Sequence, residues 1–251
     1  MFKTQMLDFK FISLMSGSKG NSLIIQTDET TIMIDCGGPK KALLDGLAQH
    51  HIDVEDIDAC FITHQHSDHI QQIKTFSKRP LYSCQEITHV AAHIIQPLEK
   101  IVVNECVIIP FSVSHDIDNV GYMIHTRLCK IVCVSDTGYL RQDELALLHN
   151  ADFYYFESNY EPTLLMLSKR PHLVKIRTIS DSGHLSNEDS ARYMKALIGP
   201  KTQEVMLGHI SEDANTFSLA LLAHAKAWFD EHPHIRLTCA KQFEVTVGGK
   251  I

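Results

Sequence analysis

The sequence of 251 residues lacks long apolar runs, an excess of basic charge and a regular spacing of its cysteines. No apolar stretch approaches the roughly 20 residues that cross a bilayer. Residues 1–10 also lack an apolar core of signal-peptide length, so we expect a cytoplasmic protein. The net charge of −7 argues against a protein that coats nucleic acid, because neutralising phosphates needs clustered Lys and Arg. An enzyme that holds nucleic acid through a local patch is not excluded.

The seven cysteines are scattered, odd in number and mostly inside apolar runs, which is typical of reduced thiols in a core. Cys129 and Cys133 could be interpreted as a metal-binding pair. However, the segment from Leu128 to Val134 has the apolar character of a buried strand. We therefore expect both thiols to be packing residues.

Short apolar segments alternate with helical patterns along the whole chain, without a linker or a repeat. The predicted strands are 9–15, 23–27, 31–35, 59–63, 101–103, 106–113, 120–125, 128–134, 153–157, 205–208, 235–239 and 243–247. The predicted helices are 40–50, one after Asp68, 141–149, one from the N-cap Ser186 to about Leu197, and a long one with Phe217, Leu221, Ala225, Trp228 and Phe229 on its apolar face. Two sheets packed face to face with helices outside would accommodate this order, as would other α/β arrangements.

The segment that carries chemistry is His64-Gln65-His66-Ser67-Asp68-His69, between a predicted strand and a predicted helix. Residues two apart in an extended loop point the same way, so His64 and His66 can bind one ion. Asp68 and His69 then turn toward a neighbouring position. Imidazole and carboxylate groups suit zinc, manganese or iron.

Three further ligand candidates stand where apolar strands end. His115 follows one strand, Asp136 another and His209 a third. A lone histidine of this kind is more often structural than a ligand. Together with the first motif, the three positions indicate a metal centre.

The order of these residues along the chain, with Asp35 before them, resembles the metallo-β-lactamase superfamily pattern. The resemblance implies a four-layer αββα sandwich and two divalent ions that share a hydroxide, which attacks the scissile centre. It implies that His64, His66 and His115 hold one ion, that Asp68, His69 and His209 hold the second, and that Asp136 bridges both. Asp35 would support the histidine loop without binding metal.

Additional segments narrow the resemblance to the YycJ/WalJ group, small bacterial proteins of this fold regarded as DNA exonucleases. They are 13–22, Ser114-His115-Asp116, 136–139, 156–160, 169–177 and 182–189. Glu161 and Lys169 depart from the usual pattern, outside the metal motifs. The resemblance implies one domain over residues 1–251, without the β-CASP domain that RNase J-type enzymes insert.

The substrate candidates lie apart from the metal motifs. Lys169, Arg170, Lys175 and Arg177 form a basic cluster without an acidic residue between them, although a solvated helix face has the same pattern. Ser18, in the turn from Ser16 to Ser22, could bind phosphate through backbone N–H groups, or the turn could simply be a tight hairpin. The segment Ser182-Gly183-His184 resembles one in RNase J-type nucleases, so His184 is a candidate phosphate contact and, with Asp68, a catalytic candidate.

The leading hypothesis is a phosphodiesterase or DNA exonuclease with two zinc or manganese ions, or iron. The alternatives are a metallohydrolase acting on a thioester, a lactone or a small cyclic phosphodiester, and a non-catalytic metal-binding regulatory protein. The sequence predicts nucleic acid as partner and no membrane. It does not decide whether the substrate is DNA or RNA, whether cleavage starts from an end or inside the chain, or whether the protein forms a homodimer.

Overall fold

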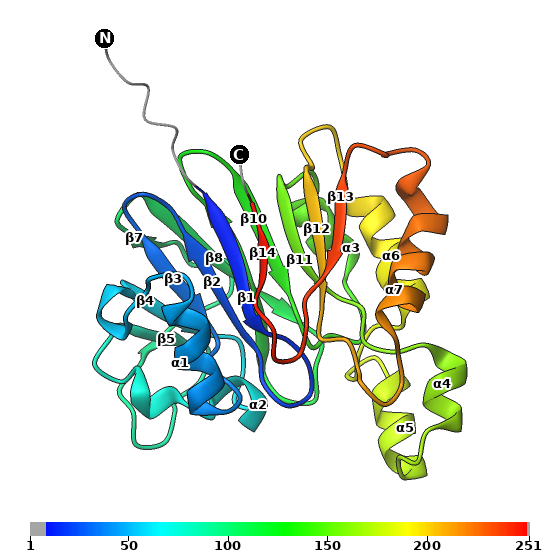
Figure 1. The fold of residues 1–251 in the computed structure, drawn as a ribbon, viewed down its shortest axis with the longest axis horizontal. Coiled ribbons are helices and arrows are strands. Elements are labelled where there is room, and N and C mark those ends of the chain that lie inside the picture. The colour runs from blue at the N-terminus through cyan, green and yellow to red at the C-terminus, as the bar shows by residue number, and fades with distance from the viewer. Residues whose placement is uncertain (1–8, 250–251) are drawn as a thin grey trace.

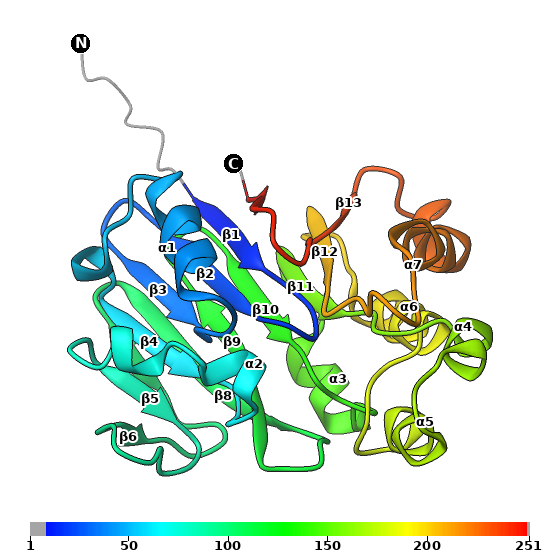
Figure 2. The ribbon, with the colours of Figure 1, turned by 60° about the horizontal axis from the view of Figure 1, so that its bottom comes forward.

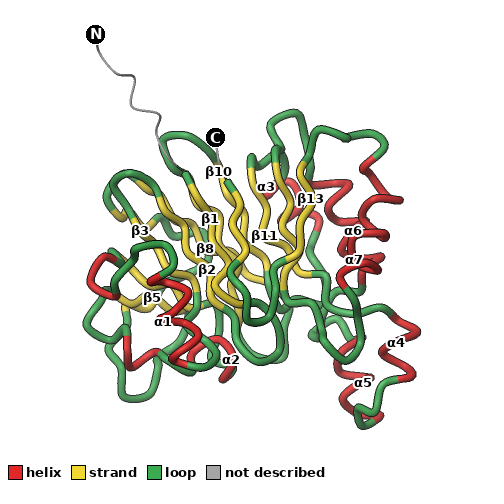
Figure 3. Tube along the Cα trace, viewed as in Figure 1, coloured by secondary structure: helices red, strands yellow, loops and turns green. Residues whose placement is uncertain are grey.

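The computed structural model describes residues 9–249, in which two seven-stranded sheets lie face to face. The first sheet has the order β14-β1-β2-β3-β4-β5-β6 and the second β13-β12-β11-β10-β9-β8-β7. In Figure 3 the strands occupy the middle of the molecule, and helices lie on both outer sides. The predicted four-layer αββα sandwich is confirmed.

The strand bounds follow the apolar segments of the sequence closely. The first sheet consists of β1 (Lys10–Met15), β2 (Ser22–Gln26), β3 (Thr31–Ile34), β4 (Ala59–Ile62), β5 (Leu81–Ser83), β6 (His93–Ile94) and β14 (Thr246–Gly248). The second consists of β7 (Ile101–Val103), β8 (Cys106–Val113), β9 (Asn119–His125), β10 (Lys130–Val134), β11 (Phe153–Glu157), β12 (Glu204–Gly208) and β13 (Arg236–Cys239).

The helices cover the outer faces of the sheets and one edge of the molecule. They are α1 (Lys40–Ala48), α2 (Ser67–Ile70), α3 (Gln142–Leu148), α4 (Pro162–Leu167), α5 (His172–Ile179), α6 (Asn187–Leu197) and α7 (Phe217–His224). Short 3-10 turns lie at Val54–Asp56 and Ile73–Thr75, and α7 continues into a π-helical turn at Ala225–Phe229. Ser186 caps α6 as predicted, because its hydroxyl accepts the N–H of Asp189.

Three apolar layers hold the sandwich together, because the strands are apolar on both faces. Phe9, directly before β1, and Phe11 in β1 pack between the two sheets, whereas Ile12 and Leu14 of β1 pack on the α1 side. The third layer joins the second sheet to α3, α6 and α7 through residues such as Trp228. Cys129 and Cys133 lie in the layer between the sheets, so the interpretation as packing residues holds.

The C-terminal third differs from the prediction in two places. The buried side of the last helix contains Ala220, His224 and Trp228, whereas Phe217 is exposed, because apolar residues occur on every side of Phe217–His224 and do not single out one face. The last strand begins at Thr246 instead of Phe243, which is exposed.

The helices α4 and α5 form a hairpin, here called the arm (residues 162–180), that projects beyond the sandwich in both Figure 1 and Figure 2. Leu165 anchors it in a small apolar cluster with Tyr160 and Ala214. Among the described residues, no helix is long and apolar enough to cross a membrane.

Candidate metal centre

The predicted ligands meet at one end of the sandwich, where strands of both sheets run out into loops. The loop after β4 carries His64 and His66, and α2 directly behind it carries Asp68 and His69. The loops after β8, β10 and β12 carry one candidate each. Four of the seven are almost fully buried: His64, His69, Asp136 and His209. Seven side chains that are far apart in sequence therefore lie together.

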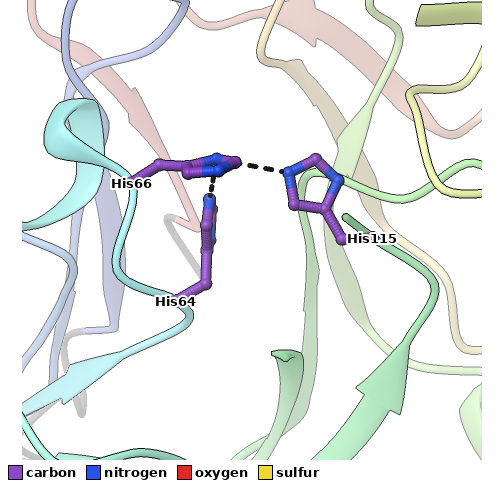
Figure 4. Close-up of side chains that lie close together, drawn as sticks. All are labelled: His64, His66 and His115. Carbon is purple, nitrogen blue, oxygen red and sulfur yellow. Dashed lines mark hydrogen bonds between the residues drawn. The ribbon is translucent and has the colours of Figure 1, made fainter. Parts of the chain in front are cut away.

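A first group of nitrogens comes from His64, His66 and His115 (Figure 4). The Nδ1 of His66 lies 3.1 Å from the Nε2 of His64 and 3.4 Å from the Nε2 of His115. Ligand nitrogens on one tetrahedral zinc ion are about 3.3 Å apart, since each Zn–N bond is about 2.0–2.1 Å. Burial lowers the pKa of His64 well below its usual value and also lowers that of His115, so both offer lone pairs. This group fits a metal ion.

A second group comprises Asp68, His69 and His209. The Oδ2 of Asp68 lies 3.6 Å from the Nε2 of His69 and 3.8 Å from the Nε2 of His209. The Nε2 of His209 is buried and has no hydrogen-bond partner within residues 9–249. A buried polar atom without a partner is costly, and a cation in this group would supply one.

Asp136 lies between the two groups and can serve both. Its Oδ2 is 3.2 Å from the Nε2 of His69, and it forms a possible ligand set with His64 and His69. Burial alone would raise the pKa of Asp136, but the neighbouring imidazoles, His209 first, lower it well below its usual value. The carboxylate is therefore ionised and suited to bridging two cations.

The carboxylates around His209 favour a positive charge on its imidazole ring. Burial would lower the pKa of His209, but Asp136, Asp68 and Glu157 outweigh it and raise the pKa to about 10. Binding a metal ion there must release protons, because an imidazole ligand needs its lone pair.

The backbone bends sharply at three of these strand ends. Asp35, Asp136 and His209 have φ angles of 59°, 56° and 52°, in the left-handed region. Such a conformation costs about 1–3 kcal/mol per residue and persists only where surrounding contacts enforce it. The Oγ of Ser16 accepts the N–H of His209 at 2.7 Å, and Asn119 donates to the carbonyl of Asp136 at 2.8 Å.

Asp35 lies directly behind the first histidine motif. Its Oδ1 accepts the N–H of Thr63, and its Oδ2 accepts the Thr63 hydroxyl and the Nδ1–H of His69, all at 2.8 Å. These bonds direct the Nε2 of His69 toward the centre. The structure thus places Asp35 where a supporting role requires it.

Two acidic residues next to the centre received no role from the sequence. Glu157 is fully buried, and its Oε1 accepts the Nδ1–H groups of His184 and His209, both at 2.8 Å. Its position at the end of β11, a strand between two ligand-bearing strands, is the signal that could have found it.

Asp116 is the second such residue, directly after a strand-end histidine. Its Oδ1 lies 3.3 Å from the Nε2 of His66 and 3.2 Å from the Nε2 of His115. The Nδ1 of His66 faces the first group, and its Nε2 edge faces the carboxylate of Asp116. The other oxygen of Asp116 binds Arg177 of the arm at 2.9 Å.

The substrate candidates are only partly gathered at the centre. Arg170 donates to the hydroxyl of Ser211 at 2.8 Å, close to His209, and Arg177 reaches Asp116. Lys175 donates to a carbonyl within the arm, and Lys169 has no hydrogen bond or ion pair with any residue of 9–249.

The turn from Ser16 to Ser22 braces the centre. Its Asn21 amide lies 3.0 Å from the Nε2 of His69, and the hydroxyl of Ser16 holds the His209 backbone. Ser18 is exposed, and its side chain makes no hydrogen bond within residues 9–249. The turn is thus more than a hairpin, although its contacts come from residues other than Ser18.

Three comparisons with known proteins agree with this geometry. The model of the Metallo-beta-lactamase superfamily matches residues 16–80. The exodeoxyribonuclease YycJ of Bacillus anthracis is 30% identical over 228 residues, which cover 85% of this chain and 86% of that protein. The exodeoxyribonuclease WalJ of Streptococcus pneumoniae is 31% identical over 231 residues, with the same two shares.

Among solved structures, the metallo-β-lactamase fold protein YhfI from Bacillus subtilis superposes with a TM-score of 0.72 at 18% identity. The match covers 96% of this chain and all of that one. At this identity the likeness concerns the fold alone.

Proposed function

Because this chain belongs to the metallo-β-lactamase superfamily, and within it to the group of the YycJ and WalJ exodeoxyribonucleases, we propose that it degrades DNA as a metal-dependent exonuclease. The observation that carries the proposal is the convergence of seven ligand-type side chains: two adjacent groups of three, and Asp136, which forms a further possible ligand set with His64 of one group and His69 of the other. The chain is a hydrolase of this superfamily, and its phosphodiester specificity is the proposed part.

The proposed ligand roles follow the two groups. His64, His66 and His115 would hold one divalent ion, and Asp68, His69 and His209 would hold the other, with Asp136 between them. Zinc, manganese or iron fits imidazole and carboxylate ligands, and the supply in the cell selects among them. Two bound ions would acidify water and stabilise negative charge on the scissile phosphate.

The residues around the centre position substrate and ligands. His184 is fixed by its Nδ1–H bond to Glu157, which turns the Nε2 edge away from that carboxylate and leaves it for a phosphate oxygen. Its side chain is 16% exposed, so a substrate can reach it, whereas the buried His209 cannot be reached in this way. Glu157 would therefore position both the proposed ligand His209 and the proposed phosphate contact His184.

The basic residues of the arm would hold the nucleic-acid backbone beside the centre. Arg170 and Arg177 already reach the two loops that carry His209 and His115. Lys169, Lys175 and Ser18 complete the proposed contacts to the substrate. We also propose that residues 1–251 act as one domain in the cytoplasm, where DNA is available.

A digestion panel tests this function. Protein loaded with Mn²⁺ or Zn²⁺ is incubated with single-stranded DNA, duplex DNA, RNA, bis(p-nitrophenyl) phosphate, a thioester and a lactone. We expect release of nucleotides from DNA ends and turnover of the phosphodiester, both abolished by chelator. Turnover of only the thioester or the lactone would overturn the proposal, as would a metal-loaded protein that is inert on every phosphodiester.

A further inference from the structure

The arm exposes an unusual amount of apolar surface. Of the fourteen large apolar side chains that are exposed in residues 9–249, six belong to the arm: Met166, Leu167, Leu173, Val174, Ile176 and Ile179. Leu173 is 79% exposed and Leu167 77%. Leu173, Ile176 and Ile179 recur every three residues and so follow one side of α5. An apolar surface of this extent indicates a binding partner.

The charge of the arm decides which kind of partner fits. Its four basic residues are accompanied by no acidic residue between 162 and 180, whereas the whole chain has a net charge of −7. A second copy that packed through the same face would bring these cations together, since a two-fold contact is made by the same patch on both chains. A polyanion would instead be attracted.

The arm lies directly beside the candidate metal centre. Arg177 of α5 binds Asp116 at 2.9 Å, beside His66 and His115, and Arg170 binds Ser211 at 2.8 Å, beside the loop of His209. The backbone of His184 donates to the carbonyl of Thr178, so the end of α5 adjoins the candidate phosphate contact. A nucleic-acid strand that lay along the arm would therefore lead into the metal centre.

We propose that the apolar side of α5 receives unpaired nucleobases of the strand that is being degraded, while the basic residues of the arm hold its phosphates. A surface that bound phosphate alone would not need exposed Leu and Ile side chains, and a protein-binding surface would not need four basic residues in a segment without any acidic residue. Aliphatic side chains do pack against nucleobases in protein–nucleic acid complexes. The inference rests on the proposed function, because it assigns the substrate of the same centre.

The test compares two single strands of equal length, one with normal bases and one with abasic sugars at every position. Both carry phosphorothioate linkages to resist cleavage and a fluorescent label, and their affinities for the metal-loaded protein are measured by fluorescence anisotropy. We expect the protein to bind the base-bearing strand about tenfold more tightly, since burying two aliphatic side chains supplies at least about 1.4 kcal/mol.

The variant that tests the surface is Leu173→Ser with Ile176→Ser. We expect it to bind both strands with the weaker affinity of the abasic strand. Val102→Ser is the matched control, because Val102 is an exposed apolar residue (66%) on β7, outside the arm. Both should melt at the wild-type temperature; if the double variant does not fold, Leu173→Ser alone should lose about threefold in the same assay.

The remaining outcomes overturn the inference. Equal affinity of the wild-type protein for both strands would do so, as would a double variant that retains the wild-type preference for bases. A wild-type dimer that the double variant converts to a monomer, with DNA affinity unchanged, would identify the face as a contact between copies. The digestion panel separates the two proposals, since DNA cleavage without a preference for bases refutes only this inference.

Discussion

The metal centre and the arm touch through Asp116 and Arg177, yet they are built in opposite ways. In the centre, buried side chains are held by hydrogen bonds from two or three directions, and strained backbone at Asp136 and His209 is enforced by neighbours. The arm has one small apolar anchor at Leu165 and otherwise presents its side chains to solvent. Rigid construction suits precise chemistry, and an exposed surface suits contact with an extended substrate.

Because the metal centre and the arm are built differently, substitutions in them should impair different properties of the protein. Changes in the centre should act on metal binding and the chemical step for every phosphodiester. Changes in the arm should act on the affinity for nucleic acid. An arm variant that lost metal, or a centre variant that lost only its affinity for nucleic acid, would contradict this division.

The largest effect is expected from Asp136→Ala, which removes the residue that both ligand groups share. Loss of several kcal/mol of charge stabilisation corresponds to a decrease in kcat/KM of about 1000-fold or more. Hydrolysis of bis(p-nitrophenyl) phosphate measures it. Asp143→Ala is the control, because the Asp143 side chain is 77% exposed on α3. A residual rate within tenfold of the wild-type rate would show that Asp136 is not shared.

Asp116→Ala should weaken metal binding about 10–100-fold, the usual cost of losing a group that orients a ligand. The Oδ1 of Asp116 fixes the Nε2 side of His66, so the Nδ1 ligand would lose its orientation. Calorimetric titration with Mn²⁺ or Zn²⁺ measures the change. Asp118→Ala, in the same loop, should keep wild-type affinity because Asp118 binds Gln85 instead.

His224 is a buried histidine that lies outside both the metal centre and the arm. His224 accepts the Trp228 N–H and contacts Ser190, and burial lowers its pKa to about 3. In the unfolded chain His224 takes up a proton below about pH 6.5, whereas in the folded protein it stays neutral down to about pH 3. The free energy of unfolding should therefore fall by about 1.4 kcal/mol for each pH unit between 6.5 and 3.

Urea unfolding between pH 7 and pH 5 measures this dependence. His224→Gln should reduce the slope by about one proton, and His234→Gln, at an exposed position, should leave it unchanged. A slope in His224→Gln equal to that of the wild-type protein would mean that other groups cause the acid sensitivity.

The smallest effect is expected in the arm. Lys169→Glu should weaken DNA binding about threefold. It should also reduce the slope of log Kd against the logarithm of salt concentration by about one, which corresponds to one lost phosphate contact. Lys226→Glu, which makes the same charge change on the last helix, is the control. Equal losses in the two variants would mean that net charge, and not the arm, determines binding.

Most of the fold could be predicted because the strands are apolar on both faces and short turns separate them. β11 was predicted at its observed bounds, Phe153–Glu157, and α6 begins at the predicted cap. The short strand β5 and the edge strand β6 were missed, since three and two residues give no period. The buried face of the last helix was predicted wrongly, because apolar residues occur on every side of Phe217–His224 and give no clear period.

The metal ligands were predictable because strand ends place ligand-type residues where a motif can be recognised. Glu157 and Asp116 were not assigned, since their role depends on which atoms of His184, His209 and His66 they contact. That information is three-dimensional, and an acidic residue after a strand is common. The same holds for Arg177, whose partner Asp116 lies 61 positions away by sequence number.

Metal content together with anomalous diffraction shows whether the seven side chains bind two ions. Protein saturated with Mn²⁺ or Zn²⁺ should contain two ions per chain, with the Nε2 of His209 bound to one and Asp136 touching both. One ion per chain, or a second ion bound away from Asp136 and His209, would contradict this account.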